Sequence, residues 1–288
     1  MPDLLVLLEV VRSGSITRAA QRLNTVQSNV TARIAKLEQA LATPLLKRHA
    51  RGVKPTPAGE AAVQLAQRLG AVLDDLRFTF AGASSPVSSQ LRIGAIETVL
   101  ASHLPPVIAA FSKQHPRIDV SVCTGSSAAL IERLNEGTID AAFVSRPTGS
   151  RELRERVVFR DELVLLESAT TRAAQKPWLR DGPPFDILVQ RLGCSYTERL
   201  LATIGKTPRR PYRLVELGTL EGVLRFVEAG LGVATLPRAF VKAAGFRRRL
   251  ALSELPPRTR DLQTYLLLLS AADSPFAANA FSALLSSA

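Results

Sequence analysis

Residues 15–56 constrain the fold of this chain more than any other segment, because two short helical patterns joined by a turn are followed there by a basic hairpin. From Ile16 to Leu23, apolar residues recur at i, i+3, i+4 and i+7, which predicts a helix with one buried face. Ser15 is a suitable N-cap for this helix, and Gly14 is suited to end the helix before it. The second helical pattern forms one apolar stripe that consists of Val30, Ile34, Leu37 and Leu41.

The exposed side of the second helix and the hairpin after it carry side chains suited to DNA. Small residues let a helix backbone lie deep in the major groove, where Gln, Asn, Ser and Thr can meet base edges or phosphates. Lys and Arg around Gly52 suit phosphate or minor-groove contact. An ordinary amphipathic helix would show the same periodicity, but residues 1–60 hold nine Lys and Arg against four Asp and Glu, an excess of +5.

These features together predict a winged helix-turn-helix that reads duplex DNA. The expected DNA contacts come from Ser15, Thr17, Gln27, Ser28, Asn29, Thr31, Arg33, Lys36, Arg48, Arg51 and Lys54.

Several short motifs of this region occur in the order that LysR-type transcriptional regulators share. They are Gly14–Ala20 (GSITRAA), Gln27–Thr31 (QSNVT), Leu37-Glu38, Leu45–Arg48 (LLKR) and Thr56–Gly59 (TPAG). The N-terminal region resembles that family, and the resemblance extends over nearly the whole chain with looser motifs. It implies a bacterial regulator that binds promoter DNA and responds to a small molecule held in its C-terminal half.

Two residues depart from the family's usual pattern. Val26 stands where the family commonly has a Ser that caps the recognition helix, so capping is expected to fall to Thr25, Asn24 or solvent. Ala32 stands where the family often has an Arg, and Arg33 or Lys36 are the candidates to replace its contact. The departures leave the DNA-binding prediction in place but define no particular target sequence.

Composition describes an ordinary globular protein of two or three domains. The chain has 288 residues, 46% hydrophobic and 22% charged, with a net charge of +12. The N-terminus lacks the features of a signal peptide and the apolar run Tyr265–Leu269 is far too short to span a bilayer, so we expect a cytoplasmic protein without a membrane partner. Two cysteines fit a reducing compartment, and the three histidines show no ligand-like spacing to them, so no metal and no other cofactor is expected.

A long helix is predicted to follow the DNA-binding segment. Thr56 is a suitable N-cap with Pro57 at the first helical position, and the pattern then continues without proline to about Phe80. A narrow apolar seam on this helix suits pairing with a second identical helix, although packing on the chain's own core is the alternative. The seam consists of Ala62, Leu65, Leu69, Val72 and Leu76, and the resemblance implies a dimerising linker helix. Small residues at 81–86 then predict a hinge.

Strand and helix patterns alternate in the rest of the chain, which predicts an α/β fold with a mostly parallel, doubly wound sheet. The expected strands are Leu91–Gly94, Asp119–Thr124, Asp140–Val144, Asp186–Gln190, Arg213–Leu217, Val233–Leu236 and Leu262–Leu269. By resemblance this half forms two lobes like those of type 2 periplasmic solute-binding proteins, with the chain crossing near Arg160–Val164 and returning near Arg260–Thr264.

The fold class is therefore α/β overall, with an N-terminal all-α winged helix-turn-helix, a long linker helix and a two-lobed C-terminal domain. We expect the DNA-binding domain at 1–58, the linker helix at 59–82, the hinge at 83–90 and the effector-binding domain at 91–288. Within that domain, lobe I is expected at about 91–162 and 265–288, and lobe II at about 163–264.

Hydroxyl groups follow several predicted strands, at the points where such sheets bind ligands and where helix N-termini favour anions. Each hydroxyl alone is more often an ordinary N-cap, but their convergence on one edge of both lobes favours a ligand site. The candidates are Thr98, Thr124, Ser126, Ser127, Ser145, Ser195 and Thr219. A small carboxylate or other anion is the expected effector, and Glu97 leaves room for an amine-bearing one.

The leading interpretation is an oligomeric transcriptional regulator whose partners are promoter DNA, a small-molecule effector and its own copies, with RNA polymerase as a further candidate. An enzyme is disfavoured because no G-x-S-x-G elbow, P-loop or metal cluster is found, so no catalytic residue is assigned. A redox-responsive regulator acting through Cys123 and Cys194 is a second alternative. A solute-binding transport component is a third, disfavoured by the attached DNA-binding segment.

Overall fold

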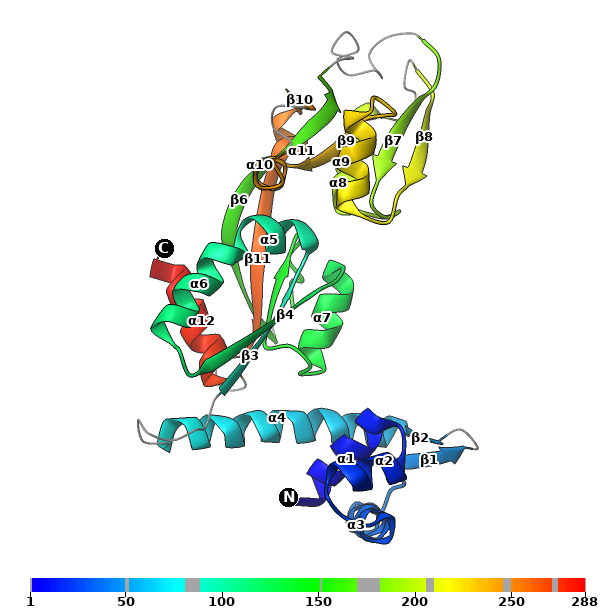
Figure 1. Cartoon of the computed structure of the whole chain (residues 1–288), viewed down its shortest axis with the longest axis vertical. Coiled ribbons are helices and arrows are strands. Elements are labelled where there is room, and N and C mark those ends of the chain that lie inside the picture. The colour runs from blue at the N-terminus through cyan, green and yellow to red at the C-terminus, as the bar shows by residue number, and fades with distance from the viewer. Residues whose placement is uncertain are drawn as a thin grey trace.

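A computed structural model describes residues 2–49, 52–80, 89–150, 152–169, 182–205, 210–245, 250–270 and 274–287. Figure 1 shows a small helical head with a hairpin, a long single helix, and an α/β part divided into two lobes. The α/β part is held by two strands that run through both lobes, β6 and β11.

The head consists of short helices and a two-stranded hairpin, built around one buried cluster. Its elements are α1 (Pro2–Ser13), α2 (Ile16–Arg22), α3 (Gln27–Ala40), β1 (Leu46–His49) and β2 (Gly52–Pro55). The apolar stripes expected from the sequence face one another in this cluster, whose fully or nearly buried members include Leu7, Val10, Ala19, Val30, Ile34 and Leu45. The expected helix-turn-helix with its basic hairpin is therefore present.

The ends of α2 and α3 are capped differently. Ser15 caps α2 as expected, since its side chain accepts a hydrogen bond from the Arg18 backbone N–H at 3.4 Å. At α3 the N-cap is Val26 and no side-chain cap bond is made. The Thr25 hydroxyl, one of the expected caps, instead accepts a bond from the Asn29 side chain, so a side-chain cap from Thr25 is a wrong expectation.

Close approaches of the backbone tie the hairpin to the helices. A Cβ on Gly52 would collide with the Gly14 carbonyl oxygen, and a Cβ on Gly59 would collide with the Leu45 carbonyl oxygen. The Gly14 carbonyl accepts the Val53 N–H at 3.1 Å. Glycine at positions 52 and 59 therefore serves close backbone contact rather than flexibility.

Helix α4 (Pro57–Phe80) follows the hairpin and packs against α1. The Thr56 hydroxyl accepts the Gly59 N–H at 3.0 Å, which confirms the expected cap. Ala62 is buried in the head's own cluster, so the alternative of packing on the chain's own core is correct there, whereas Leu65 is 60% exposed. The side chains of Val72 and Leu76 and the expected hinge at 81–86 lie outside the described residues.

Each lobe combines strands and helices with parts of the two crossing strands. Lobe I contains β3 (Ser89–Ala95), α5 (Glu97–Ser102), α6 (Leu104–Gln114), β4 (Ile118–Thr124), α7 (Ser127–Asn135), β5 (Ala141–Val144) and α12 (Phe276–Ser287). Lobe II contains β7 (Phe185–Val189), α8 (Ser195–Ile204), β8 (Tyr212–Glu216), α9 (Leu220–Glu228), β9 (Ala234–Pro237), α10 (Arg238–Ala243), β10 (Leu250–Glu254) and α11 (Pro257–Arg260). The crossing strands are β6 (Leu153–Ser168) and β11 (Asp261–Leu269).

The sheet differs from the expected one in the relative direction of its strands. In the described part of the chain, the seven-stranded sheet has the order β10-β6-β11-β5-β3-β4, with β9 also paired to β6. Among the strands named above, parallel pairing is confined to β3 with β4 and β5 and to β7 with β8, whereas β6 and β11 pair antiparallel with each other and with their other neighbours. The expectation of a mostly parallel sheet is therefore corrected, because a chain that crosses between lobes and returns runs in opposite directions.

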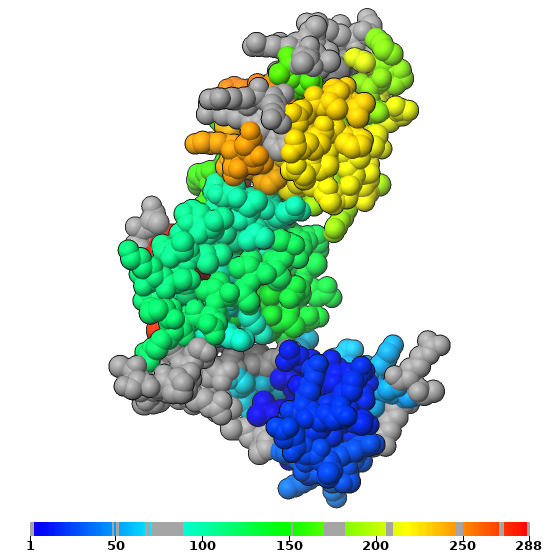
Figure 2. Space-filling view, viewed as in Figure 1, coloured from blue at the N-terminus to red at the C-terminus, as the bar shows by residue number. Residues whose placement is uncertain are grey.

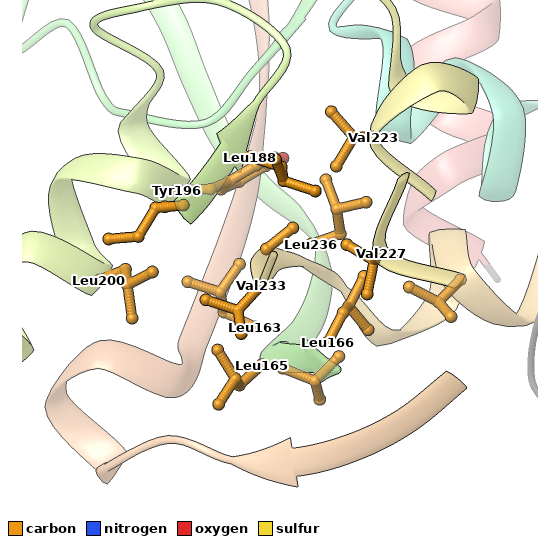
Figure 3. Close-up of a cluster of buried hydrophobic side chains, with 14 of the residues drawn as sticks. Leu163, Leu165, Leu166, Leu188, Tyr196, Leu200, Val223, Val227, Val233 and Leu236 are labelled. Carbon is orange, nitrogen blue, oxygen red and sulfur yellow. The ribbon is translucent and has the colours of Figure 1, made fainter. Parts of the chain in front are cut away.

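Buried side chains form separate clusters in the two lobes. The lobe II cluster runs from Leu163 to Leu262 in sequence and is drawn in Figure 3, where side chains from β6, α8 and α9 converge. The largest lobe I cluster includes Leu91, Phe143 and Phe281. The lobes thus have separate cores, joined by the crossing strands and by contacts such as that of α10 with α5.

Candidate functional site

The exposed face of α3 carries short and mostly polar side chains. Figure 1 places α3 at the end of the head that points away from the lobes. Val30 and Ile34 are buried against the head, whereas Gln27, Ser28 and Asn29 are exposed. Ala32, Ala35 and Lys36, further along the helix, are exposed as well. This face combines small residues with short polar groups, which is the surface a recognition helix needs in a major groove.

Arg33, one of the expected DNA contacts, is engaged inside the head. Its Nε donates to the Asp3 carboxylate at 2.6 Å, and the two side chains are 33% and 24% exposed. This hydrogen bond is the main cause that lowers the pKa of Asp3 below its ordinary value. Arg33 therefore joins α3 to α1, and sequence reasoning had no local signal for that pairing.

The hairpin places two lysines side by side. Lys47 and Lys54 are direct partners across β1 and β2, and both are exposed. Like charges directly opposite each other destabilise a strand pair, so the arrangement favours an external anion such as a phosphate. Lys47 belongs to the basic hairpin around Gly52 that the sequence predicts for phosphate or minor-groove contact. The side chain of Arg48 and all of Arg51 lie outside the described residues.

Three serine hydroxyls form a chain across the two lobes. The Ser127 Oγ, at the start of α7, lies 3.2 Å from the Ser145 Oγ, and the Ser145 Oγ lies 3.3 Å from the Ser195 Oγ at the start of α8. Ser145 follows β5 directly, so strand ends and helix N-termini meet here as the sequence predicts. Figure 2 shows the surface of α8 and α9 lying directly over that of α5 along the seam between the lobes.

A second contact between the lobes joins Thr98 and Tyr196. Their hydroxyl oxygens lie 2.9 Å apart, and both residues are buried. Burial raises the pKa of the Tyr196 hydroxyl to about 12, so this group stays protonated and can donate a hydrogen bond. Tyr196 was not among the expected site residues, because an aromatic residue in a helix pattern usually signals only core packing.

Two charged residues next in sequence to these hydroxyls also pair across the lobes. The Gln190 amide nitrogen of lobe II donates to the Glu97 carboxylate of lobe I at 2.5 Å. Arg146, directly after Ser145, pairs with Glu198 of lobe II. Each lobe I charge is therefore held by a polar group from the opposite lobe. Gln190, Arg146 and Glu198 were also missing from the expected set, since nothing in the sequence indicates which groups meet across the seam.

The remaining candidate hydroxyls have other places in the structure. Ser126 caps α7 by accepting the Ala129 N–H at 3.2 Å, and Thr219 caps α9 by accepting the Gly222 N–H at 3.0 Å. Thr124 is exposed at the end of β4. For Ser126 and Thr219 the structure thus gives the ordinary cap role, and their part in ligand binding stays a prediction.

A narrow cavity of about 10 Å³, enough for about one water molecule, lies beside these hydroxyls at the crossing strands. Its lining includes Thr98, Ser145, Tyr196, His103 and Asp161. His103 lies 3.7 Å from the Asp161 carboxylate and stacks on Phe159, with ring centroids 4.6 Å apart. The cavity therefore lies at the closed junction of the two lobes, and most of its exposed lining is apolar.

The described residues hold neither a metal cluster nor a membrane-spanning helix. Within these ranges no three His, Cys, Asp or Glu side chains gather as a metal site. None of the helices there is long and apolar enough to cross a bilayer. Cys123 and Cys194 are free and half-buried, and they pack against different lobes.

A winged helix-turn-helix joined through a long helix to a two-lobed α/β domain defines the class of ligand-responsive, DNA-binding transcriptional regulators. The model of the lysR family of bacterial regulatory helix-turn-helix proteins matches residues 1–60, and that of the LysR substrate binding domain matches residues 84–288. The chain belongs to the LysR family of transcriptional regulators. The enzyme and transport alternatives are therefore set aside.

Relatives and solved structures agree with this assignment. The chain is 36% identical over 266 residues to the HTH-type transcriptional regulator YofA of Bacillus subtilis, covering 91% of this chain and 89% of YofA. Its fold is similar to ArgP from Mycobacterium tuberculosis, with a TM-score of 0.75, 20% identity and coverage of 99% and 97% of the two chains. It is also similar to LysG from Corynebacterium glutamicum with bound effector Arg, with a TM-score of 0.71, 19% identity and coverage of 99% and 96%.

Proposed function

We propose that the effector of this regulator is a small metabolite that carries both a carboxylate and an ammonium group, and that it binds between the lobes. The observation that supports this most is the pair of opposite charges Glu97 and Arg146, which adjoin Thr98 and Ser145 in sequence and each meet a lobe II group. Each is now held by a lobe II group of the kind that a ligand would replace. Glu198 stands where a ligand carboxylate would meet Arg146, and the Gln190 amide stands where an ammonium would meet Glu97.

The strand register brings the two charges to one edge. Ala95 pairs with Phe143 in the parallel ladder of β3 and β5, so Glu97 and Arg146 leave neighbouring strands at the same end. Neighbouring strands lie about 4.8 Å apart, so the two residues follow strands that end next to each other. The hydroxyls of Ser127 and Ser195 at the starts of α7 and α8 add donors for the carboxylate. The LysG structure with bound effector Arg supports an amino acid as a ligand of this fold.

Binding of such a ligand would exchange contacts between the lobes for contacts to the ligand. The ligand therefore shifts the population of lobe arrangements in proportion to its preference for one of them. We propose that the chain is divided into a DNA-binding domain (1–58), a linker helix (59–82), a hinge (83–90) and an effector-binding domain (91–288). The movement of the lobes is then passed through the hinge and the linker helix, and α4 pairs two copies of the chain. RNA polymerase is a further partner in this proposal. The regulator acts in the cytoplasm, where the chromosome lies.

For the DNA interface we propose polar and basic groups of the head. The groups that contact DNA directly are Ser15, Gln27, Ser28, Asn29, Thr31, Lys36, Lys47, Arg48, Arg51 and Lys54, and Thr17 acts behind Gln27, to which its hydroxyl donates. Arg33 is left out because its guanidinium pairs with Asp3.

A thermal-shift screen tests the effector class. Amino acids are compared with matched compounds that lack either the amine or the carboxylate, because a ligand at a hundred times its Kd stabilises the folded chain by about 2.7 kcal/mol. We expect the zwitterion to raise Tm more than either analogue, and Glu97→Gln and Arg146→Gln each to abolish the difference. Lys113→Gln, at an exposed position of α6 outside the proposed site, is the control. Equal responses to the zwitterion and its analogues would contradict the proposal.

A further inference from the structure

Two amide side chains in the first turn of α3 are each tied at one end by a threonine hydroxyl. The Thr17 Oγ1 donates to the Gln27 Oε1 at 3.1 Å. The Asn29 Nδ2 donates to the Thr25 Oγ1 at 2.8 Å. The two hydrogen bonds have opposite polarity, because one holds the oxygen of an amide and the other holds the nitrogen.

Opposite polarity leaves different groups available to DNA. With its oxygen turned toward α2, Gln27 presents its NH2 group outward and acts as a donor. With its nitrogen turned toward the Thr25 hydroxyl, Asn29 presents its oxygen outward and acts as an acceptor. Both amides are exposed, at the end of the recognition helix that meets base edges in helix-turn-helix proteins.

We propose that Thr17 and Thr25 are positioning residues that set the base preference of this regulator through Gln27 and Asn29. A Gln whose oxygen is turned toward Thr17 offers chiefly its NH2 group, which suits guanine O6 or N7 or thymine O4, whereas the paired bonds to adenine also need that oxygen to face the base. An Asn whose nitrogen is turned toward Thr25 offers chiefly its oxygen, which suits the amino group of cytosine or adenine. The inference rests on the DNA interface proposed above and does not depend on the proposed effector.

The two amides address different base pairs. Residues two apart in an α-helix have Cα atoms about 5.4 Å apart, from a radius of about 2.3 Å and a rise of about 1.5 Å per residue. Successive base pairs are separated by about 3.4 Å along the duplex. The effects of the two threonines are therefore expected at separate positions of one binding site.

The test is selection from a randomised duplex DNA library by the full-length protein. Thr17→Val, Thr17→Ser, Thr25→Val and Thr25→Ser are compared with the unchanged chain, and Thr43→Val is the matched control in the same head. We expect Thr17→Val to gain adenine at one base pair, because a freed Gln27 oxygen restores the paired bonds. We expect Thr25→Val to change the preferred base at a different base pair, and each Ser variant to select the same sequences as the unchanged chain. The affinity for the originally selected site should fall about 2- to 10-fold with each Val substitution.

A double-mutant cycle separates positioning from direct contact. In a Gln27→Ala background, Thr17→Val is expected to have no further effect on affinity or preference. Thermal melting of each variant shows that the head stays folded. The proposal is overturned if the Val variants weaken all sequences equally, if the Ser variants fail to restore selection, or if the effect of Thr17→Val persists without Gln27.

Discussion

One carboxylate fixes the recognition helix to the hairpin that follows it. The Glu38 Oε1 accepts the backbone N–H groups of Leu45 at 2.7 Å and Leu46 at 3.1 Å. In the sequence, Glu38 stands out only as part of a family motif. The structure gives the reason for that motif, because the carboxylate satisfies two backbone donors where the chain turns from α3 to β1.

Removing this carboxylate should destabilise the head. We expect Glu38→Ala to lower the free energy of unfolding by about 2–3 kcal/mol, because two half-buried N–H groups lose a charged acceptor. Glu38→Gln should lose about half as much, since its amide oxygen still accepts. Urea denaturation of the full-length protein measures both values, and an Ala variant as stable as the unchanged chain would refute the role.

The ion pair of Asp3 and Arg33 gives the head an acid-sensitive contact. The Asp3 pKa is lowered in the folded state, chiefly by its hydrogen bond to Arg33, so the contact stabilises at pH above the ordinary Asp value. This contribution is lost as the pH falls through the lowered pKa. We expect Asp3→Asn to reduce the fall of Tm between about pH 5 and pH 3, relative to the control Glu9→Gln. An unchanged pH profile would contradict this assignment.

At the scale of elements, the β1–β2 hairpin carries two lysines that suit DNA binding but lower its own stability. Lys47 and Lys54 repel each other across the strands, and DNA phosphates remove that conflict. Each lysine that contacts a phosphate contributes about 0.9 to the slope of log K against log salt concentration. We expect the double variant Lys47→Ala, Lys54→Ala to reduce this slope by about 1.8 without lowering Tm.

Fluorescence anisotropy with a labelled duplex over a range of salt concentrations measures this slope. Lys113→Ala, an exposed lysine of α6, is the control that should leave it unchanged. An equal slope in the double variant and the control would show that the two lysines do not meet phosphates.

Helix α4 is the element for which the expected seam and the observed burial differ. Ala62 faces the head of its own chain, but Leu65 is 60% exposed one turn later. An exposed Leu in this position favours contact with a second copy. We expect Leu65→Asp to shift the oligomer toward monomer in light scattering after gel filtration. Leu231→Asp, which replaces a leucine of similar exposure (55%) in lobe II, should not.

At the scale of the whole molecule, the two lobes are closed on each other by hydroxyl contacts. Thr98→Val removes the partner of the Tyr196 hydroxyl and leaves that buried group unpaired in the closed form. We expect the closed form to lose about 1–3 kcal/mol relative to an open one. Small-angle scattering should then report a larger radius of gyration, whereas Thr124→Val, at an exposed position, should leave it unchanged. An identical scattering profile would show that this contact does not hold the lobes.

The sequence by itself determined the elements whose signals are local. The periodicity of Ile16 to Leu23 predicted α2, the Ser15 and Thr56 caps predicted where α2 and α4 begin, and Pro57 marked the first residue of α4. Strand patterns predicted most strands of both lobes within one or two residues. These features depend on neighbours a few residues apart, which a sequence displays directly.

Only the tertiary structure decided which distant groups meet. Arg33 pairs with Asp3 thirty residues away, and Thr98 meets Tyr196 ninety-eight residues away. The antiparallel course of β6 and β11 likewise follows from the crossing between lobes rather than from any strand pattern. A side chain's partner across a fold depends on the register and rotation of whole elements, and those are set by packing of the two cores.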